Sequence, residues 1–469
     1  MSRLKLRIRS PLLEEIIIES DTAVADIYNK GIFNLLEGIP QFPFGNRQST
    51  MDETFCTDAT HTRYEHSLIV YEIVGRLCDH FGIKDKNKEL LQTAGLLHDI
   101  GNIQLPYHVL ETKKGDHEPH TKKIIKTNRE LVRKMKRHGL DPEAVAKATD
   151  SNIVDLADKL AYIAKDAAMT SILPAEMDSW AQENYSLDSL LQHLVMHKRG
   201  KIHLKQKSDD LMFPYKQVYN YYWTRMNLSN MYFFNDVFRF FGSALKEAAI
   251  TCGYKPKYDK YNPKVIAQKM LRRLGRQKGG GDKRIDTLLN CIWKDYSWTH
   301  STQMYIVRGQ EPGLKELLQL ASNDKRRMVF EKKVEDELGV YILIDSTQKI
   351  NPWKAMPFLL ENGKTFNSQK AVATYEKILR GEKTNSLDFP DSIADDGGPC
   401  IPDEGIQGFV VDIAAMNQLY YGLRDFRIFS PNPLSTNQKR KLTGMLKKEI
   451  HKETFLHHGN TPVAISYVI

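Results

Sequence analysis

Three short clusters of histidine and carboxylate residues, far apart in the chain, contain side chains that bind divalent cations. The first cluster ends at His66, the second is the adjacent pair His98 and Asp99, and the third begins at Asp158. Two imidazoles and two carboxylates suit Mn, Fe, Co, Ni or Zn, and they can leave coordination positions open for water and a phosphate oxygen. Such a cation would lower the pKa of water and neutralise charge on a phosphoryl group under attack. We therefore expect these four residues to form a catalytic metal centre.

Each cluster has a plainer interpretation when it is taken alone. Neighbouring side chains point about 100° apart on a helix, so His98 and Asp99 reach one ion only near a helix end. A lone His-Asp dipeptide is usually accidental, a single helical Asp158 is usually a solvated charge, and His66 alone could be an ordinary polar residue. The ordered combination of all three clusters favours the metal centre.

The three clusters also resemble motifs of the HD superfamily, specifically those of the deoxynucleoside triphosphate triphosphohydrolases that include bacterial dGTPase. The stretch His-Thr-Arg-Tyr-Glu-His66-Ser-Leu is similar to the first motif, and Leu-Leu-His98-Asp99-Ile-Gly-Asn is similar to the second. Asp158-Lys-x-x-Tyr-x-x-x-Asp agrees with the third motif, and the specific likeness covers roughly residues 15 to 170. The resemblance implies that these same two histidines and two aspartates hold the metal.

Further residues near the third motif are expected to bind substrate. The resemblance implies that Lys159 pairs with phosphate oxygens, that Tyr162 packs against the sugar and excludes a 2′-hydroxyl, and that Asp166 accepts a hydrogen bond from the 3′-hydroxyl. Positions 158, 162 and 166 share one face of a helix, so they can line a single pocket wall. Arg63, three residues before a proposed ligand, has a planar guanidinium that could bind the triphosphate. The alternatives are core packing for Tyr162 and a solvent-exposed position for the three charged residues.

The proton donor is expected shortly after the His-Asp pair. The family usually reads Gly-(His/Asn)-Pro-Pro-Phe-Gly-His-x-x-Glu there, whereas this chain reads Gly-Asn-Ile-Gln-Leu-Pro-Tyr-His108-Val-Leu-Glu111, without the proline pair and with one residue added. We assign His108 as the donor to the leaving oxygen, oriented by Glu111, because a histidine titrates near neutrality and a carboxylate can fix its tautomer. His117, followed by Glu118, resembles a His-Glu of some family members and is the alternative donor. A third interpretation gives these loop histidines no catalytic duty.

Helices are predicted to position these groups. Apolar residues recur at helical spacing over 68–81, from about 88 to 101, and over 152–169. The His-Asp pair would then lie in the last turn of the second helix. The aromatic-rich segment 213–250 is interpreted as buried helices rather than as a stacking platform.

The C-terminal region changes character. Short segments rich in Val and Ile, flanked by turn residues, predict strands at 339–345, 408–413, 426–429 and 462–469, with a loop over 389–405. The fold class expected is therefore mainly α, with an HD-domain helical core and a smaller mixed α/β C-terminal appendage. The expected organisation is an HD phosphohydrolase core at 1–260, a basic helical and loop segment continuing it at 261–330, and the mixed α/β region at 331–469.

Composition narrows the class of protein. The chain has 469 residues, of which 41% are apolar and 27% charged, and its mean hydropathy of −0.46 argues against membrane residence. No secretory signal is recognised at the N-terminus, so a cytoplasmic location is expected. Five scattered cysteines without a Cys-x-x-Cys pair are expected to be reduced thiols. The balance of 67 Lys and Arg against 58 Asp and Glu favours anionic partners such as nucleotides or nucleic acid.

The resulting hypothesis is attack of water on the α-phosphorus of a deoxynucleoside triphosphate, which gives a deoxynucleoside and triphosphate. The cofactor expected is a divalent metal ion, Mn, Mg, Fe, Co, Ni or Zn. The resemblance suggests a homo-oligomer and admits a nucleotide or single-stranded DNA effector. The basic run 122–137 would supply further cations, or would form a solvated helical face.

Two alternatives stay open. An HD phosphohydrolase acting on a monophosphate, a cyclic nucleotide or guanosine tetraphosphate would keep the metal and change the substrate, and the third motif argues against it. A nucleic-acid-binding regulatory protein with a vestigial HD site is supported by the basic segment 264–284, and the intact ligand set argues against that reading.

Overall fold

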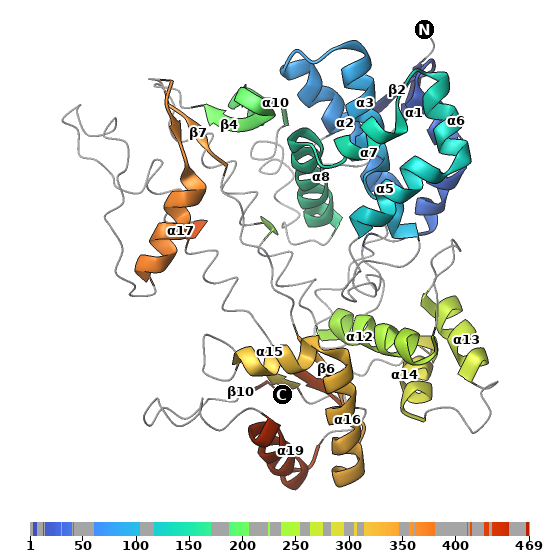
Figure 1. The fold of residues 1–469 in the computed structure, drawn as a ribbon, viewed down its shortest axis with the longest axis vertical. Helices are drawn as coiled ribbons and strands as arrows, with labels where there is room; N and C mark the ends of the chain where they lie inside the picture. Colours follow the sequence, from blue (N-terminus) through green and yellow to red (C-terminus); the bar gives the residue numbers. More distant parts are fainter. Residues whose placement is uncertain are drawn as a thin grey trace.

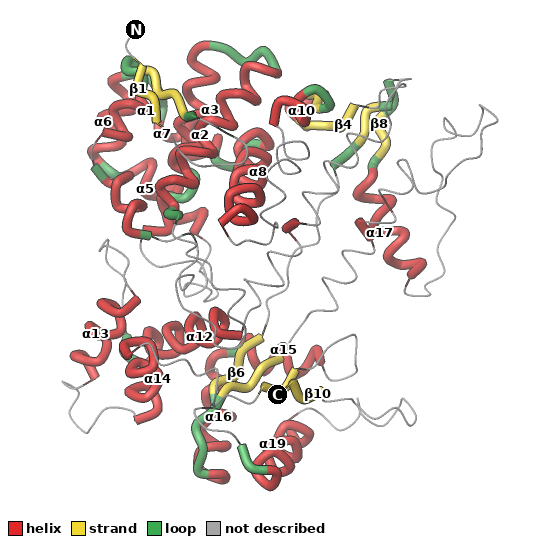
Figure 2. The backbone as a smooth tube through the Cα atoms, turned by 180° about the vertical axis from the view of Figure 1, so that it is seen from behind, coloured by secondary structure: helices red, strands yellow, loops and turns green. Residues whose placement is uncertain are grey.

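The computed structural model is mainly helical, with short strands. It describes residues 3–6, 13, 15–29, 31–39, 41, 61–103, 117–169, 187–205, 224–225, 236–253, 263–274, 283–294, 304–306, 314–346, 356–360, 363–379, 410, 413–414, 426–430, 434–449 and 466–468. Figures 1 and 2 show the helices of the first half of the chain gathered at one end and most later helices at the other. The mainly α fold class with small sheets in the C-terminal region is confirmed.

The N-terminal half is a bundle centred on helix α2. The strands and helices that precede and surround it are β1 (Arg3–Leu6), β2 (Ile16–Glu19), α1 (Ala23–Asn29), η1 (Ile32–Gly38), α3 (Asp85–Leu97), η3 (Ile100–Ile103), α5 (His117–Thr127), α6 (Arg129–Arg137), α7 (Pro142–Ala148) and α8 (Asn152–Met169). Helix α2 itself spans Arg63–His80 and packs against both α3 and α8. The helices predicted from spacing at 68–81 and 152–169 are thus confirmed, the second with the same bounds.

Helix α2 starts earlier than its apolar pattern indicates because a polar cap fixes its first turn. Thr62 is the N-cap, and its hydroxyl accepts a hydrogen bond from the backbone N–H of Glu65 at 3.3 Å. Thr-x-x-Glu is the sequence of a capping box, which satisfies backbone donors that have no partner inside the helix. The cap therefore places His66 one turn into the helix, where its side chain is buried.

Two glycines allow helices α2 and α3 to approach closely. A β-carbon at Gly95 of α3 would lie 3.0 Å from a methyl carbon of Val74, and one at Gly75 of α2 would lie 2.5 Å from the amide nitrogen of Gln92. A larger residue at Gly95 would require Val74 to move by a few tenths of an ångström, and one at Gly75 would require the end of the Gln92 side chain to move aside. The close contact holds the two histidine-bearing helices in one register.

Helix α3 ends earlier than predicted. The sequence interpretation extended it to about Gly101, but it ends at Leu97, and His98 is its C-cap with helical dihedral angles. The chain then turns into η3, with the backbone N–H of Asn102 donating to the carbonyl of Asp99 at 2.9 Å. The His-Asp pair therefore lies in a turn between two helical segments, which we call the HD turn (residues 98–102).

The described part of the C-terminal half contains helices and short strands, and only some of them contribute to a second apolar cluster. These helices and strands include α12 (Asp236–Thr251), α13 (Pro263–Leu274), α14 (Lys283–Lys294), β5 (Met304–Ile306), α15 (Leu314–Ser322), α16 (Asp324–Leu338), β6 (Leu343–Ser346), β9 (Phe426–Phe429), α19 (Thr436–Glu449) and β10 (Ser466–Val468). Strands β6 and β9 pair antiparallel, as do β5 and β10. Residues from α15, α16, β6, β9 and α19 form the apolar cluster between them.

Most strand predictions in this half are confirmed, and one is wrong. Strands occur within or overlapping the predicted segments near 343, 426 and 466. In the segment 408–413, however, the described residues Val410 and Ile413 are helical and buried, as is Ala414. Their i, i+3, i+4 spacing is that of a helix, and it outweighs the strand preference of Val and Ile. The predicted loop at 389–405 lies outside the described residues.

A small mixed sheet joins distant parts of the sequence. It is formed by β3 (Leu194–His197), β4 (Lys201–Lys205), β7 (Phe358–Leu359) and β8 (Thr365–Phe366), and it lies between helices α10 (Leu187–Leu191) and α17 (Ser368–Leu379) in the chain order. Strand β4 pairs parallel with β7, with Leu204 opposite Phe358. The backbone N–H of Leu204 also donates to the carbonyl of Pro357 at 2.9 Å. The second half of the chain thus completes a sheet that begins directly after the helical bundle.

A buried cluster of opposite charges connects α12, α14 and α16. Arg327 donates to Glu331 at 2.9 Å and also to Glu247, while Arg284 pairs with Glu247 at 3.2 Å and with Glu331. The backbone N–H of Ile344 donates to Glu331 at 2.7 Å, which adds strand β6 to the cluster. Burial lowers the pKa of Arg327, but the two glutamates raise it above its usual value, so the guanidinium remains charged.

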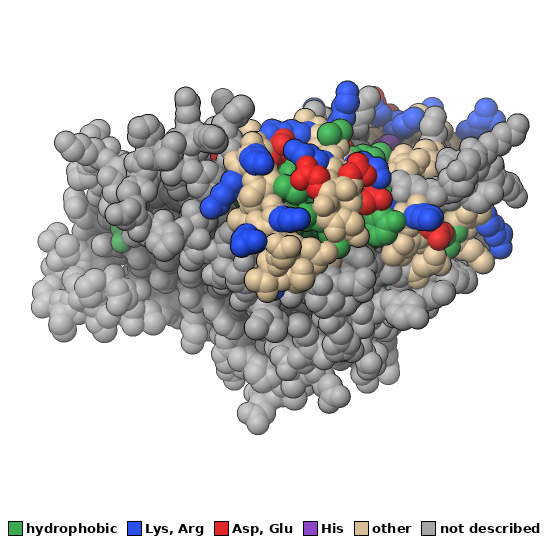
Figure 3. All heavy atoms as spheres, turned by 90° about the horizontal axis from the view of Figure 1, so that it is seen from below, with side chains coloured by type: hydrophobic (Ala, Val, Ile, Leu, Met, Phe, Trp, Pro, Cys, Tyr) green, Lys and Arg blue, Asp and Glu red, His purple; other side chains and the backbone are tan. Residues whose placement is uncertain are grey.

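The surface of this half mixes both signs of charge. Figure 3 shows basic and acidic side chains intermingled around small hydrophobic areas on the described part of this face. On α16, for example, exposed Lys332 lies 3.0 Å from Glu335 and 3.1 Å from Asp336. None of the described helices is long and apolar enough to span a bilayer. Of the predicted thiols, Cys78 and Cys252 are buried, Cys291 lies in α14 with its side chain outside the description, and Cys56 and Cys400 lie outside the described residues.

Candidate metal centre

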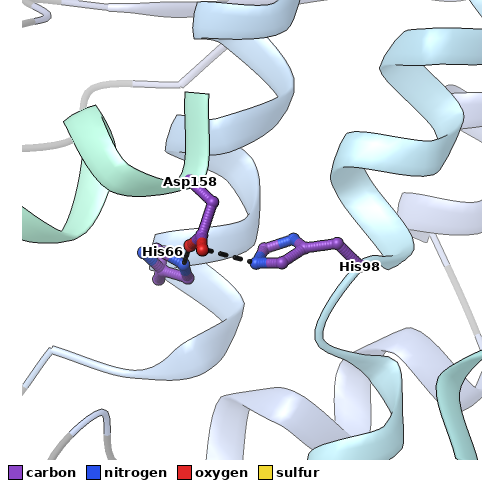
Figure 4. Close-up of side chains that lie close together, drawn as sticks. All are labelled: His66, His98 and Asp158. Carbon is purple, nitrogen blue, oxygen red and sulfur yellow. Dashed lines mark hydrogen bonds and ion pairs between the residues drawn. The ribbon is translucent and has the colours of Figure 1, made fainter. Parts of the chain in front are cut away.

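His66, His98 and Asp158 point toward one another from three different elements (Figure 4). His66 lies on α2, His98 caps α3 and Asp158 lies on α8. Oδ1 of Asp158 is 2.9 Å from Nε2 of His66 and 3.4 Å from Nε2 of His98. One ligand atom from each residue lies within 4.8 Å of the other two. Two imidazole nitrogens and a carboxylate oxygen therefore converge on one point.

The hydrogen bond of His98 sets the ring in the tautomer that binds metals. Its Nδ1 lies 2.8 Å from the carbonyl oxygen of Gly95, which can only accept, so Nδ1 carries the proton. In a neutral ring this leaves the lone pair on Nε2, the atom that faces Asp158. Metal-ligating histidines are commonly oriented by such a bond to a backbone carbonyl. The arrangement therefore fits a divalent cation held by His66, His98 and Asp158.

Asp99 lies beside this group, and both of its carboxylate oxygens have protein partners. Arg63 donates to Oδ2 and Asn102 donates to Oδ1 at 2.8 Å. Oδ2 also lies 3.7 Å from Nε2 of His98 and 4.0 Å from Nε2 of His66. The carboxylate is thus placed at the edge of the three-residue group, and Arg63, which we expected to bind phosphate, contacts it directly.

The charges of the centre stabilise one another. Burial raises the pKa of Asp158, but hydrogen bonds from His66 and His98 outweigh this and hold it well below its usual value. Burial lowers the pKa of His98, and the carboxylates of Asp99 and Asp158 raise it to about 9 overall. Protein atoms crowd the Asp158 carboxylate, yet its side chain keeps 34% of its surface accessible. The centre is thus reachable from solvent on the Asp158 side.

The other residues of the third motif differ in their exposure and contacts. Lys159 is partly exposed and pairs with Asp155 on the same helix at 2.5 Å, so its ammonium group faces solvent. Tyr162 is partly buried and packs against the core. The guanidinium carbon of Arg225 lies 5.4 Å from the centre of the Tyr162 ring. Asp166 is in helix α8, and its side chain lies outside the described residues.

The proposed proton donors are not placed by the structure. His108 and Glu111 lie outside the described residues. His117 is the first residue of α5, but its side chain is also outside them. The assignment of the donor therefore stays a prediction.

Three residues near the centre have contacts that the sequence interpretation did not assign. Asn102 holds Asp99, the hydroxyl of Thr121 bonds to the HD turn, and Arg225 stacks on Tyr162. Asn102 and Thr121 follow recognised motif residues closely, so their proximity in sequence was the available signal. Arg225 lies in the aromatic-rich segment that was interpreted only as core, and a single arginine within it was the sole hint.

Most basic residues of the run 122–137 are exposed on α5 and α6, whereas Lys134 is buried. Lys122 pairs with Asp150 at 2.6 Å and Lys126 with Glu143 at 3.3 Å. Arg137 pairs with Asp26 at 3.0 Å. These contacts favour the interpretation of a solvated face.

Comparison with known proteins agrees with this geometry. Residues 63–163 match the family model described as HD domain. The chain is 29% identical over 173 residues to the uncharacterized protein YwfO of Bacillus subtilis, and 27% identical over 157 residues to the uncharacterized protein MG461 of Mycoplasma genitalium. These alignments cover 32% and 31% of this chain and only 39% and 35% of the two relatives.

Two solved structures share the fold over most of the chain. A hypothetical protein from Aquifex aeolicus superposes with a TM-score of 0.52 and 14% identity, covering 96% of this chain and all (100%) of that one. A protein called phosphohydrolase, from Bacteroides thetaiotaomicron, superposes with a TM-score of 0.53 and 14% identity, covering 91% and 99%. The segment that matches the HD domain model, residues 63–163, begins with α2, contains the HD turn and ends within α8. Residues 63–163 of this chain therefore match the HD domain family and carry all three converging residues.

Proposed function

We propose that the chain is a metal-dependent phosphohydrolase that converts deoxynucleoside triphosphates into deoxynucleosides and triphosphate. The observation that carries the proposal is the convergence of His66, His98 and Asp158 within an HD domain. A divalent cation bound there would lower the pKa of a water molecule and neutralise phosphoryl charge. The Bacteroides protein of similar fold is called a phosphohydrolase, which agrees with hydrolysis of a phosphate ester here.

The choice of a triphosphate substrate rests on the cations around the centre. A nucleoside triphosphate carries about four negative charges, and phosphoryl transfer depends chiefly on positioning and charge neutralisation. Arg63 lies at the centre through its contact with Asp99, and Arg225 lies nearby against Tyr162. A phosphate that competes with Asp99 for Arg63 would exchange one anionic partner for another at little electrostatic cost. Lys159 would reach the phosphates after leaving Asp155, a partly exposed pair that contributes little stability.

The choice of a deoxyribose substrate rests on Tyr162. Its ring lies one helical turn from Asp158, so it is placed on the same face as a metal ligand. The guanidinium of Arg225 lies over the ring, and this attraction favours the ring's present position. A ring in that position against the sugar would leave no space for a 2′-hydroxyl, and Asp166 would accept a hydrogen bond from the 3′-hydroxyl.

Product analysis tests the proposal. Purified protein, stripped with chelator and reloaded with Mn²⁺ or Mg²⁺, is incubated with each of the four deoxynucleoside triphosphates and with one ribonucleoside triphosphate. Triphosphate and deoxynucleoside, formed only with metal and only from deoxynucleotides, are the expected products. Orthophosphate, a monophosphate product or equal turnover of the ribonucleotide would contradict the proposed substrate class. Absence of any metal-dependent hydrolysis, together with tight DNA binding, would contradict the proposal that the chain is a phosphohydrolase.

The assembly and effectors of the enzyme belong to the same proposal. We propose a homo-oligomer whose activity responds to a nucleotide or to single-stranded DNA. Light scattering with and without each effector, combined with rate measurements, tests both points. A monomer with identical rates under all conditions would contradict them.

A further inference from the structure

Thr121 uses its hydroxyl differently from five other threonines in the described helices. Thr93, Thr127, Thr287, Thr374 and Thr443 each donate to the backbone carbonyl four residues earlier, at 2.7–2.9 Å. This is the local bond that threonine usually makes in a helix. The hydroxyl of Thr121, on α5, instead donates to the carbonyl of His98 at 3.0 Å, across 23 residues of sequence. A tertiary contact has replaced the local one.

The same hydroxyl also accepts a hydrogen bond from the HD turn. The backbone N–H of Gly101 donates to it at 3.0 Å. One side chain therefore holds a carbonyl before Asp99 and an N–H after it, so the two contacts bracket the carboxylate residue. The carbonyl of His98 lies at the C-cap of α3, where a helix leaves its last carbonyls without internal partners, and the N–H of Gly101 lies in η3.

Burial makes these two bonds hard to replace. Thr121 is 1% exposed, and the side chain of Asp99 is buried as well. A buried backbone donor or acceptor that loses its partner bears the full cost of desolvation, because no water can reach it. Removal of the hydroxyl would therefore shift the HD turn, and with it His98 and Asp99, relative to Asp158 on α8.

The contact also fixes the position of α5. This helix packs on η3, and its first residue is His117, one of the two proposed proton donors. Thr121 lies one helical turn after His117, so the bond that anchors the HD turn also anchors the first turn of α5. Displacement of α5 would change the distance between a donor at this position and the metal centre.

We infer that Thr121 is a positioning residue, which sets the HD turn and the start of α5 in register for metal binding and catalysis. This inference rests on the proposed function for its catalytic part, while its metal-binding part stands without it. Thr121→Val retains the shape of the side chain and removes the hydroxyl, Thr121→Ser restores the hydroxyl without the methyl group, and Thr127→Val removes only a local bond on the same helix.

The test compares these variants in Mn²⁺ affinity, measured calorimetrically on chelator-stripped protein, and in kcat and KM at saturating Mn²⁺. Groups that orient metal ligands typically change affinity or activity by about 10–100-fold, and we expect a loss of that order for Thr121→Val. We expect KM to stay unchanged, Thr121→Ser to restore most of the loss, and Thr127→Val to match the wild type. Thr121→Ala serves in place of Thr121→Val if the valine variant does not fold.

Two outcomes would overturn the inference. One is a folded Thr121→Val variant whose Mn²⁺ affinity and kcat equal those of Thr127→Val. The other is a loss in Thr121→Ser as large as that in Thr121→Val, which would show that the hydroxyl by itself does not set the position of the HD turn. If wild-type protein hydrolyses no deoxynucleotide, the proposed function fails, whereas the Mn²⁺ affinities still decide the role of Thr121.

Discussion

Nε2 of His66 lies 2.9 Å from Oδ1 of Asp158, although the two residues are 92 positions apart in the chain. The packing of α2 against α8 brings them together. Asp158→Ala removes the anionic member of the three-residue group and leaves two imidazoles, which hold a divalent cation more weakly than two imidazoles and a carboxylate. We expect Mn²⁺ affinity to fall by more than about 100-fold, since even partners outside the ligand set account for 10–100-fold. Calorimetric titration measures this, with exposed Asp150→Ala as the control; equal affinities for the two variants would exclude Asp158 as a ligand.

Asn102 supports the centre through Asp99. Asn102→Ala removes the donor to Oδ1 of Asp99 and leaves the contact with Arg63 in place. Because Asp99 is buried, we expect a loss of about 1.5–3 kcal/mol in unfolding free energy and a Mn²⁺ affinity lower by roughly 10-fold. Urea unfolding and metal titration check the two effects. Unchanged affinity would show that Asp99 does not depend on Asn102 for its orientation.

Arg225 is expected to act on substrate binding through Tyr162. Arg225→Ala removes the stacked guanidinium, and we expect KM for deoxynucleotides to rise by about 3–30-fold, as a partly buried cation–π contact predicts. Arg225→Lys should not restore KM, because an ammonium group lacks the planar surface that stacks on a ring. Steady-state kinetics of the wild type and the two variants measure these KM values. Full recovery in the lysine variant would mean that charge alone matters at this position.

The buried charge cluster is expected to affect stability and to leave the metal centre unchanged. Glu331→Ala leaves Arg284 and Arg327 buried with one carboxylate fewer, which typically costs about 3–5 kcal/mol. Exposed Glu337→Ala on the same helix pairs only at 3.9 Å and should cost less than about 0.5 kcal/mol. Denaturant unfolding compares the two, and Mn²⁺ titration should give the same affinity for both. A loss of metal binding in folded Glu331→Ala would contradict the expectation that the buried charge cluster does not affect the metal centre.

The β3–β4 hairpin is expected to weaken in acid. Burial lowers the pKa of His203 below its usual value of 6.5, and His197 and Lys201 lower it further. The folded hairpin therefore binds fewer protons than the unfolded chain as pH falls through about 6.5, so its stability decreases there. We expect the melting temperature to drop between about pH 7.5 and pH 5.5, and His203→Gln to reduce that drop. An identical pH dependence in both proteins would assign it to other groups.

Local patterns predicted the helices that carry the site well, and contacts between distant residues account for what they missed. The spacing of apolar residues identified α8 with its bounds, because helix periodicity is a property of consecutive residues. The end of α3 was misplaced because the turn after Leu97 is held by Thr121, which is distant in sequence. No local pattern signals such a partner.

The candidate metal centre shows the same difference between local sequence patterns and contacts of distant residues. The motif residues His66, His98 and Asp158 were named from the sequence, and the structure brings them together. Arg225 was missed because its role depends on stacking against a ring on another helix, which cannot be read from its neighbours in the chain. The contact of Arg63 with Asp99 was likewise hidden, since the sequence suggested a ligand for that arginine and gave no internal partner.

The parallel pairing of β4 with β7 has a practical consequence for anyone who isolates the HD domain. A fragment that includes β4 but stops before Pro357 would lack β7, and the edge of β4 around Leu204 would have its N–H and C=O groups uncovered. Such an open edge readily pairs with the same strand of another molecule. Such a fragment would therefore tend to precipitate even though the helices of the candidate site were all present, and truncations that retain β4 have to extend past β8.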